Sequence, residues 1–366
     1  MRSRRSTFRG LIGAVLLLAG CGGAAPASSA PPASPSAAAS AAASKPVAPA
    51  SAPATASKPA AASAAGNLTQ ITYGVAGVSA FSWPHFAAVQ IGAFEKQGIQ
   101  LNAVTTGTPA IAAKALVGGS LDVAEGAVDA FAAGIEEGAQ VVMVDQKIGN
   151  PAFSVITQPD IKTWDQIKGA KVAVSSPTEA AAIVFNVLAK KHGLTAQKDY
   201  SFVGVGITPA RYAALQAKQV QAAIMNQPVD FQAVADGYNQ LERSDLTIDH
   251  YAFIVEVVSK GWAQSHRDLL TRFLTAEVAG VNWLYDPANK QAAVDLLASK
   301  TKVAQDAALK TYDVYAGSNG KVVSKGAKFD PVGMRAYADA IAEAGIMKGP
   351  LDPAKWIDDS YINAVK

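Results

Sequence analysis

From Asn67 onward, short apolar runs alternate with longer stretches in which apolar residues recur at helical spacing. Strands are predicted over 70–76, 99–106, 121–126 and 140–146, and helices over 84–97, 110–118 and 128–137. The strands are apolar without interruption, as in strands that are covered on both faces. This βαβ order therefore favours a parallel sheet with helices on both sides.

A second set of the same kind follows. Strands are predicted over 152–158, 171–176, 200–206, 221–227 and 251–259, and helices over 178–192, 209–219 and 265–284. The two α/β units share no obvious sequence repeat, so their similarity is architectural. A chain of 366 residues also exceeds one typical domain, which favours two domains or one split domain.

The first 66 residues follow a different pattern. Arginines precede the apolar run "LIGAVLLLAG", which resembles a secretion signal and is shorter than the roughly 20 residues that span a bilayer. Leu18-Ala19-Gly20-Cys21 is similar to the lipobox of bacterial lipoproteins. We predict a signal peptide over 1–20, a lipid on Cys21 and a membrane-anchored, extracytoplasmic protein. An ordinary secretion signal with an incidental cysteine is the alternative.

Residues 21–66 are almost entirely Ala, Ser and Pro, without an aromatic residue. Such a composition cannot bury enough apolar surface to form a core, so a disordered tether is predicted. The net charge of +3 arises in this region and in the signal, because six of the 32 Lys and Arg precede Asn67 and none of the 29 Asp and Glu does. The remaining chain is near −3, which argues against a nucleic-acid partner.

Candidates for catalysis are few. The four histidines are scattered, and the sequence has no HExxH pair, G-x-S-x-G elbow, P-loop or G-x-G-x-x-G motif. Cys21 is the only cysteine, which excludes a disulfide within the chain and a thiol nucleophile elsewhere. We predict no catalytic residue, metal or cofactor. His85, beside a candidate loop, is the remaining catalytic alternative.

Binding residues are better supported, because polar and aromatic side chains gather where predicted strands end. In open parallel sheets, ligands bind beyond these carboxyl ends. Phe81 and Trp83 could instead pack in the core, and Asp129, Ser176 or Thr178 could cap helices. The candidates for ligand binding are Ser79, Phe81, Ser82, Trp83, Thr106, Glu125, Asp129, Ser175, Ser176, Thr178, Glu179 and Gln227.

Several segments resemble one known family. They are "YGVAGVSAFSWPHFAAVQIGAFEKQGIQL", "ALVGGSLDVAEGAVDAF", "IKTWDQIKGAKVAVSSPTEAA" and "QAAIMNQPVDFQA". In this order they are similar to the substrate-binding proteins of bacterial ABC importers, in the nitrate/sulfonate/thiamine-precursor group. The resemblance implies an α/β, type II periplasmic binding protein fold with two Rossmann-like lobes joined by two hinge crossings. Lobe 1 would comprise 67–152 and 252–366, and lobe 2 would comprise 153–251.

The resemblance also implies a function. The protein would be a monomer that captures a small molecule by hinge closure and delivers it to an ABC permease. The solute would be a thiamine-precursor-like compound, a sulfonate or an aromatic acid. Gln227 departs from the family's acid at that strand end, and Arg211 is the one basic residue expected to reach the cleft. The alternatives are a surface scaffold or adhesion lipoprotein, and a pyrimidine-precursor synthase on the same fold, whose cysteine-rich motif is missing here.

Overall fold

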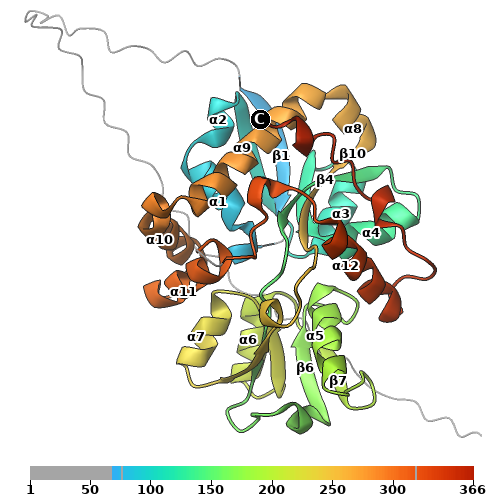
Figure 1. The fold of residues 1–366 in the computed structure, drawn as a ribbon, viewed down its shortest axis with the longest axis vertical. Coiled ribbons are helices and arrows are strands. Elements are labelled where there is room, and N and C mark those ends of the chain that lie inside the picture. The colour runs from blue at the N-terminus through green and yellow to red at the C-terminus, as the bar shows by residue number, and fades with distance from the viewer. Residues whose placement is uncertain (1–67, 76, 318–319) are drawn as a thin grey trace, which may run out of the picture. The chain divides into compact units, whose positions relative to one another are not determined.

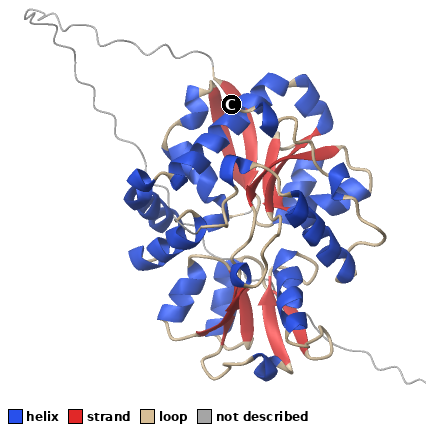
Figure 2. Ribbon diagram, in the orientation of Figure 1, coloured by secondary structure: helices blue, strands red, loops and turns tan. Residues whose placement is uncertain are grey.

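The computed structural model describes residues 68–75, 77–317 and 320–366, all within a unit that begins at Ser63. The predicted signal peptide, Cys21 and the tether lie outside the described residues. No helix in the described part is both long and apolar enough to cross a membrane. The strands and the helices alternate along most of the chain, as Figures 1 and 2 show.

The first sheet has the strand order β2-β1-β3-β10-β4. β1 pairs in parallel with β2 and β3, whereas β10 runs antiparallel between β3 and β4. The strand bounds are β1 Thr69–Val75, β2 Ile99–Thr105, β3 Val123–Ala127, β4 Val141–Ile148 and β10 Ile254–Ser259.

The second sheet has the order β7-β6-β8-β5-β9. β6 pairs in parallel with β7 and β8, and β5 is antiparallel to both β8 and β9. The strand bounds are β5 Ser154–Thr157, β6 Ala170–Val174, β7 Tyr200–Gly204, β8 Ala222–Met225 and β9 Asn239–Arg243.

Helices cover both faces of each sheet (Figure 1). In the first sheet, α1 connects β1 to β2 in one direction and α3 returns from β2 to β3 in the other, so right-handed crossovers place them on opposite faces. The bounds are α1 Trp83–Gln90, α2 Ala93–Lys96, α3 Pro109–Val117, α4 Val128–Glu136, α5 Ala180–Lys191, α6 Thr208–Gln216 and α7 Val229–Ala235. Those of the C-terminal helices are α8 Lys260–Ser265, α9 Arg267–Tyr285, α10 Lys290–Thr301, α11 Gln305–Tyr315 and α12 Pro331–Glu343.

Helices α1 and α9 pack at a very short separation. A Cβ atom on Gly280 of α9 would lie 2.3 Å from the carbonyl oxygen of Pro84 and 2.7 Å from the amide nitrogen of Ala88 in α1. Any side chain at this position would force the helices apart. Gly280 therefore holds α1, and with it the loop after β1, against the first sheet.

The order of the elements agrees with the pattern of the sequence, but the predicted parallel arrangement holds only in part, because β10 in the first sheet and β5 in the second run antiparallel to their neighbours. The chain leaves β4 at its carboxyl end and crosses directly to β5. It consequently enters the second sheet at the edge where β6 and β8 end, and must run antiparallel to β8. The return crossing to β10 has the same consequence in the first sheet.

Three local predictions also differ from the structure. The helix predicted over 84–97 is broken at Gly92, whose φ of 63° lies in the left-handed region that glycine adopts without steric cost. The helix predicted from Thr178 begins at Ala180. Strand β9 was not predicted, because its five residues are half-buried and mostly polar.

Candidate functional site

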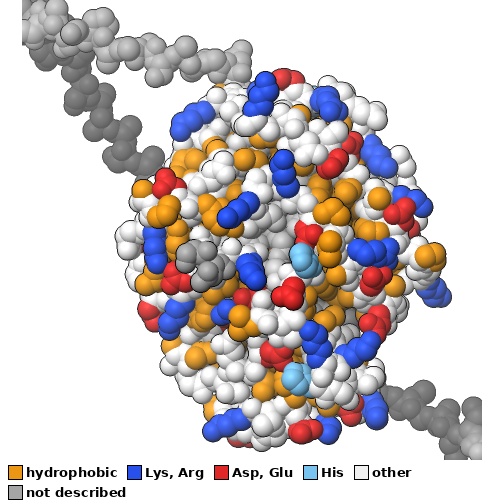
Figure 3. Space-filling model, in the orientation of Figure 1, with side chains coloured by type: hydrophobic (Ala, Val, Ile, Leu, Met, Phe, Trp, Pro, Cys, Tyr) orange, Lys and Arg blue, Asp and Glu red, His pale blue; other side chains and the backbone are white. Residues whose placement is uncertain are grey.

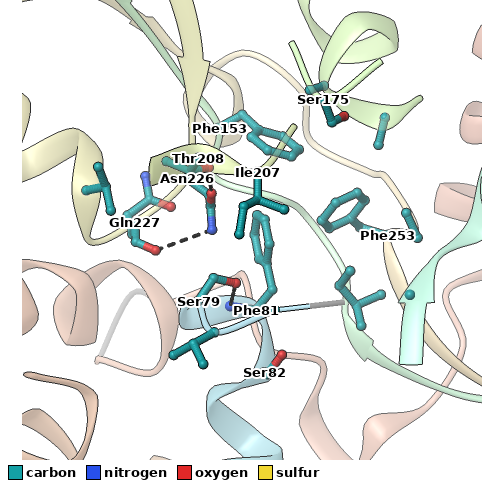
Figure 4. Close-up of a pocket in the computed structure, with 18 of the residues that line it drawn as sticks. Ser79, Phe81, Ser82, Phe153, Ser175, Ile207, Thr208, Asn226, Gln227 and Phe253 are labelled. Atoms are coloured by element: carbon teal, nitrogen blue, oxygen red, sulfur yellow. Dashed lines mark hydrogen bonds between the residues drawn. The ribbon is translucent and has the colours of Figure 1, made fainter. Parts of the chain in front are cut away.

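A cavity of about 150 Å³ lies where the two sheets face each other. Its wall combines the loop after β1, the end of β3 and the start of β10 from the first sheet with the ends of β6 and β8 from the second. The crossing segments before β5 and β10 complete it. Figure 4 shows residues from these elements pointing toward one another around the ring of Phe81. The cavity thus lies at the carboxyl ends of the parallel strands, where ligands bind in open α/β sheets.

Three phenylalanines form the apolar wall. The ring centroids of Phe81 and Phe253 are 4.8 Å apart, and Phe153 lies 5.3 Å from each of them. All three pairs meet edge to face, with interplanar angles of 70–73°. This arrangement is favourable for the rings themselves and presents both edges and faces to a bound group.

Phe153 and Phe253 were missed by the sequence analysis. Each lies in one of the two crossings between the sheets, just before β5 or β10. The signal that could have found them is a repeated Ala-Phe, in "PAFSV" and "YAFIV", directly before a strand.

Eight of the twelve predicted ligand-binding residues line the cavity. Phe81 belongs to the apolar wall, and the other seven contribute polar groups. The eight are Ser79, Phe81, Ser82, Glu125, Asp129, Ser175, Glu179 and Gln227.

The other four predicted residues lie outside the cavity lining. Trp83 is fully buried and packs against Tyr312 and Tyr315. Of the two roles considered for it, ligand binding and core packing, the structure shows core packing. Thr106 donates a hydrogen bond to the Val75 carbonyl, 3.1 Å away, and joins β2 to β1. Ser176 and Thr178 bond to each other, with 3.3 Å between their hydroxyl oxygens. None of these four side chains is part of the cavity wall.

Ser176 and Thr178 do not cap α5 either, so that part of the prediction was wrong. The N-cap residue is Glu179, which makes no capping side-chain hydrogen bond within the described structure. The N-cap residues of α4 and α6, Ala127 and Ile207, likewise lack such a bond among the residues described. All three helix starts contribute to the cavity wall. Their N-terminal N–H groups produce positive potential on this side of the cavity.

The second lobe also supplies a buried guanidinium. Arg211 in α6 is only 4% exposed, and its Nη2 donates to Thr208 Oγ1 at 2.5 Å. Its Nε and Nη1 have no hydrogen-bond partner among the residues described. Thr208 donates in turn to the Asn226 amide oxygen, and the Asn226 Nδ2 lies 3.5 Å from the Gln227 carbonyl oxygen. Burial lowers the pKa of Arg211 to about 9, so this group is still positively charged at neutral pH.

On the first lobe, the wall is backed by a buried cluster of charges. Ser82 donates to Glu125 Oε1 at 2.5 Å, and Tyr73 donates to Glu125 Oε2 at 2.9 Å. Lys147 Nζ lies 2.6 Å from Glu125 Oε2, 2.9 Å from Glu256 Oε1 and 3.5 Å from Glu277 Oε2. Lys147 was missed, because Asp145, Gln146 and Lys147 resemble the polar end of a strand although β4 buries all three.

Two acids of this cluster have pKa values shifted in opposite directions. Burial and the neighbouring Asp145 raise the pKa of Glu256 well above its usual range. Burial raises the pKa of Glu277 too, but Lys147 and His85 outweigh it and hold this pKa at about 2. His85 Nδ1 lies 2.6 Å from Glu277 Oε1 and its ring stacks on Tyr73, away from the cavity lining. The ion pairs therefore fix Glu125 at the cavity wall from behind.

Asp129 and Gln227 lie where the two lobes meet. Asp129 Oδ1 accepts a hydrogen bond from Tyr337 at 2.5 Å, and burial raises its pKa to about 6. Gln227 of the second lobe accepts bonds from the first through its carbonyl, 3.4 Å from Ala80 N, and through Oε1, 3.3 Å from the Tyr315 hydroxyl. Gln227 thus connects the cavity wall to contacts between the lobes, whereas the bond between Tyr337 and Asp129 joins two helices of the first lobe.

A model of the NMT1/THI5-like family matches residues 82–290. The chain belongs to this family. The match includes every strand of the two sheets except β1, and most of the cavity wall, from Ser82 to Ile254. No curated protein matches the chain by sequence.

Three solved structures illustrate the fold. The alkanesulfonate-binding protein SsuA from Xanthomonas axonopodis pv. citri, bound to MOPS, has a TM-score of 0.66 at 17% identity, covering 81% of this chain and 99% of that one. The nitrate-binding protein NrtA from Synechocystis PCC 6803 has a TM-score of 0.62 at 14% identity, covering 81% and 86%. The desulfurization enzyme DSZB has a TM-score of 0.57 at 15% identity, covering 81% and 98%. The NMT1/THI5-like protein thus has the predicted fold of periplasmic binding proteins, with two lobes of mixed sheets.

The described residues offer no alternative centre built on a metal. Within 68–75, 77–317 and 320–366, no group of three or more His, Cys, Asp and Glu is arranged to hold an ion. On the face in Figure 3, basic and acidic side chains are interspersed rather than gathered in fields of one sign.

Proposed function

We propose that this NMT1/THI5-like protein is the solute-binding component of an ABC importer, acting outside the cytoplasm as a monomer. The observation that carries the proposal is the cavity, because its wall is shared by the two lobes at their strand ends. A solute in that position touches both lobes at once. The names of two proteins that share the fold, an alkanesulfonate-binding and a nitrate-binding protein, support the same role.

Hinge closure is the proposed mechanism. The lobes meet at the edge of the cavity through Gln227, which bonds to Ala80 and Tyr315, and the Lys190–Glu343 ion pair joins them outside it. The contacts from Gln227 are long and the ion pair is exposed, so they contribute little alone. A solute that bonds to both lobes would shift the equilibrium toward the closed state by its difference in affinity for the two states. A permease would then recognise the closed form.

The solute is expected to be small. An apolar cavity of about 150 Å³ accommodates one benzene ring. Thiamine-precursor-like heterocycles, sulfonates and aromatic acids all remain within this size. The three phenylalanines favour an aromatic or aliphatic body over a bare inorganic anion such as nitrate.

The proposal includes a lipid on Cys21, with 21–66 acting as a spacer between the membrane and the lobes. A Cys21→Ser chain should then be found in the soluble extracytoplasmic fraction, whereas the unchanged chain should sediment with membranes. Membrane association of the Cys21→Ser chain would contradict the anchor without affecting the binding role.

The enzyme alternative has one supporting observation, because DSZB shows that the fold also occurs in an enzyme. His85, the catalytic candidate, is bonded to Glu277 and buried away from the cavity wall. The experiment that separates the two roles is uptake of radiolabelled solutes by cells with and without the gene. A receptor should be required for uptake of one solute and should return it chemically unchanged. Normal uptake in the deletion strain, or conversion of the solute by the purified protein, would contradict the proposal.

A further inference from the structure

The cavity has two chemically opposite ends. Figure 4 places Ser82 on one side of the Phe81 ring, and Thr208 and Asn226 on the other. The Thr208–Asn226 end belongs to the second lobe and contains Arg211, and the Ser82 end belongs to the first lobe and contains Glu125. A solute that closes the lobes must form favourable contacts with both ends of the cavity.

The charged group at the Arg211 end offers only donors. A guanidinium has five N–H groups and no acceptor, and two of its three nitrogens are unpaired among the described residues. No carboxylate of the described structure lies within salt-bridge distance of Arg211; Glu179 acts on it only through its charge. The start of α6 adds positive potential beside it, although Pro209 has no N–H group and the amides of Ala210 and Arg211 bond to the Ile207 carbonyl. A buried, under-bonded cation next to a helix N-terminus is complementary to an anionic group.

The end at Ser82 and Glu125 offers only acceptors. An ionised carboxylate has about four lone-pair sites, and three of those on Glu125 are taken by Ser82, Tyr73 and Lys147. The Ser82 hydroxyl donates its hydrogen bond to Glu125, so towards a further group its oxygen can only accept. This end is therefore complementary to an N–H or O–H group.

We infer that the solute is a single-ring aromatic acid with a hydrogen-bond donor on the far side of its ring. The inference rests on the proposed function and identifies its substrate class. The acid group pairs with Arg211, the ring lies among Phe81, Phe153 and Phe253, and the donor bonds to Ser82 and Glu125. Hydroxy- or amino-substituted benzoates and benzenesulfonates have this chemistry.

Two further acids, Asp129 and Glu179, line the wall. Asp129 already accepts from Tyr337, and burial favours its neutral form below about pH 6. Glu179 is half-buried and is the N-cap residue of α5. Neither acid forms a salt bridge with Arg211 within the described structure, so its Nε and Nη1 remain unpaired there.

Calorimetric titration of the full-length chain in detergent tests the inference. The probes are 4-hydroxybenzoate, 4-hydroxybenzenesulfonate, benzoate, 4-hydroxybenzyl alcohol and 4-hydroxybenzylamine. At least one of the two hydroxylated acids should bind. The one that binds more tightly shows whether the site prefers a carboxylate or a sulfonate. The alcohol and the amine should bind about 10- to 100-fold more weakly than the acid, and benzoate about tenfold more weakly.

An Arg211→Gln chain should lose about 10- to 100-fold in affinity for the acid and should no longer prefer it over the alcohol. Arg335→Gln, which changes an exposed arginine paired with Asp339, is the matched control and should bind as the unchanged chain does. Arg211→Lys keeps the charge and should retain part of the preference. The melting temperatures of all three variants check that they are folded.

Three results would overturn the inference. They are tighter binding of the alcohol or the amine than of the acids, equal affinity in the Arg211→Gln and Arg335→Gln chains, and no binding of either hydroxylated acid. None of them would contradict the receptor role, which fails separately if the deletion strain takes up every tested solute normally.

Discussion

Lys147 and Arg211 are both buried cations within the walls of one cavity, yet their surroundings are opposite. Lys147 is fully buried, pairs with Glu125, Glu256 and Glu277, and also donates to the Tyr73 hydroxyl. Arg211 is as deeply buried but makes one hydrogen bond, to Thr208. Burying a charge is costly unless it is paired. A satisfied cation thus stabilises the fold, whereas an unsatisfied one is positioned for a group that comes from outside.

The largest effect should follow from removing the satisfied cation. Lys147→Met leaves three buried carboxylates without their cation and should lower the free energy of unfolding by about 3 to 5 kcal/mol. Urea titration of the full chain measures this change. Lys168→Met, which breaks only the exposed pair with Asp165, is the matched control and should leave it nearly unchanged. Similar losses for the two variants would show that Lys147 is not the centre of the cluster.

A smaller loss is expected for Glu277→Gln. The folded pKa of Glu277, about 2, lies below the unfolded value of 4.5, so its ionised form stabilises the fold above pH 4.5. That contribution disappears as the pH falls from 4.5 to 2. The variant should lose about 2 to 3 kcal/mol at pH 7 and should show a shallower decline between these pH values. Parallel pH profiles for the two chains would refute the assignment.

Asp129→Asn should change the free energy of unfolding in the opposite direction. Burial raises the folded pKa of Asp129 from 3.8 to about 6, so the folded state binds this proton more tightly than the unfolded state. Stability is then greatest below pH 3.8 and declines as the pH rises to 6. Asn can still accept the Tyr337 bond, so the variant should be more stable at pH 7 by about 1 to 3 kcal/mol. A destabilised variant with an unchanged pH profile would contradict this explanation.

The smallest effect on stability is expected at Arg211. Arg211→Gln removes an under-bonded buried charge, so the free energy of unfolding without solute should change by about 1 kcal/mol or less, in either direction. The same variant should lose most of its affinity for the acid. A loss of more than about 3 kcal/mol in the empty chain would place Arg211 with Lys147, as a structural cation.

The sequence predicted the order of the elements well, because apolar runs and helical spacing report directly on burial. It predicted a binding site at the strand ends because polar residues gather there, and eight of the candidates line the cavity at these ends. Strand direction does not appear in such a pattern, so the antiparallel β5 and β10 were not foreseen. Neither was the charge cluster, because Lys147 and Glu256 lie far apart in the sequence and meet only across β4 and β10.

Where a single residue had two possible roles, tertiary packing decided between them, and a local sequence pattern does not report on that packing. Trp83 and Phe81 stand two positions apart in one loop, yet Trp83 packs against Tyr312 of α11 and Phe81 against Phe253 of a crossing. Ser176 was a reasonable cap, but the helix begins later, at Ala180. The residues that complete the cavity come from distant segments, which only the fold brings together.

The central claim is that a small acid occupies the cavity and pairs with Arg211. The most direct test is mass spectrometry of the compound released on denaturing the full-length chain purified from its native cells, compared with the Arg211→Gln chain. The account predicts about one single-ring acid per unchanged chain and very little from the variant. Equal amounts of one compound from both chains, or a released compound without an acid group, would contradict it.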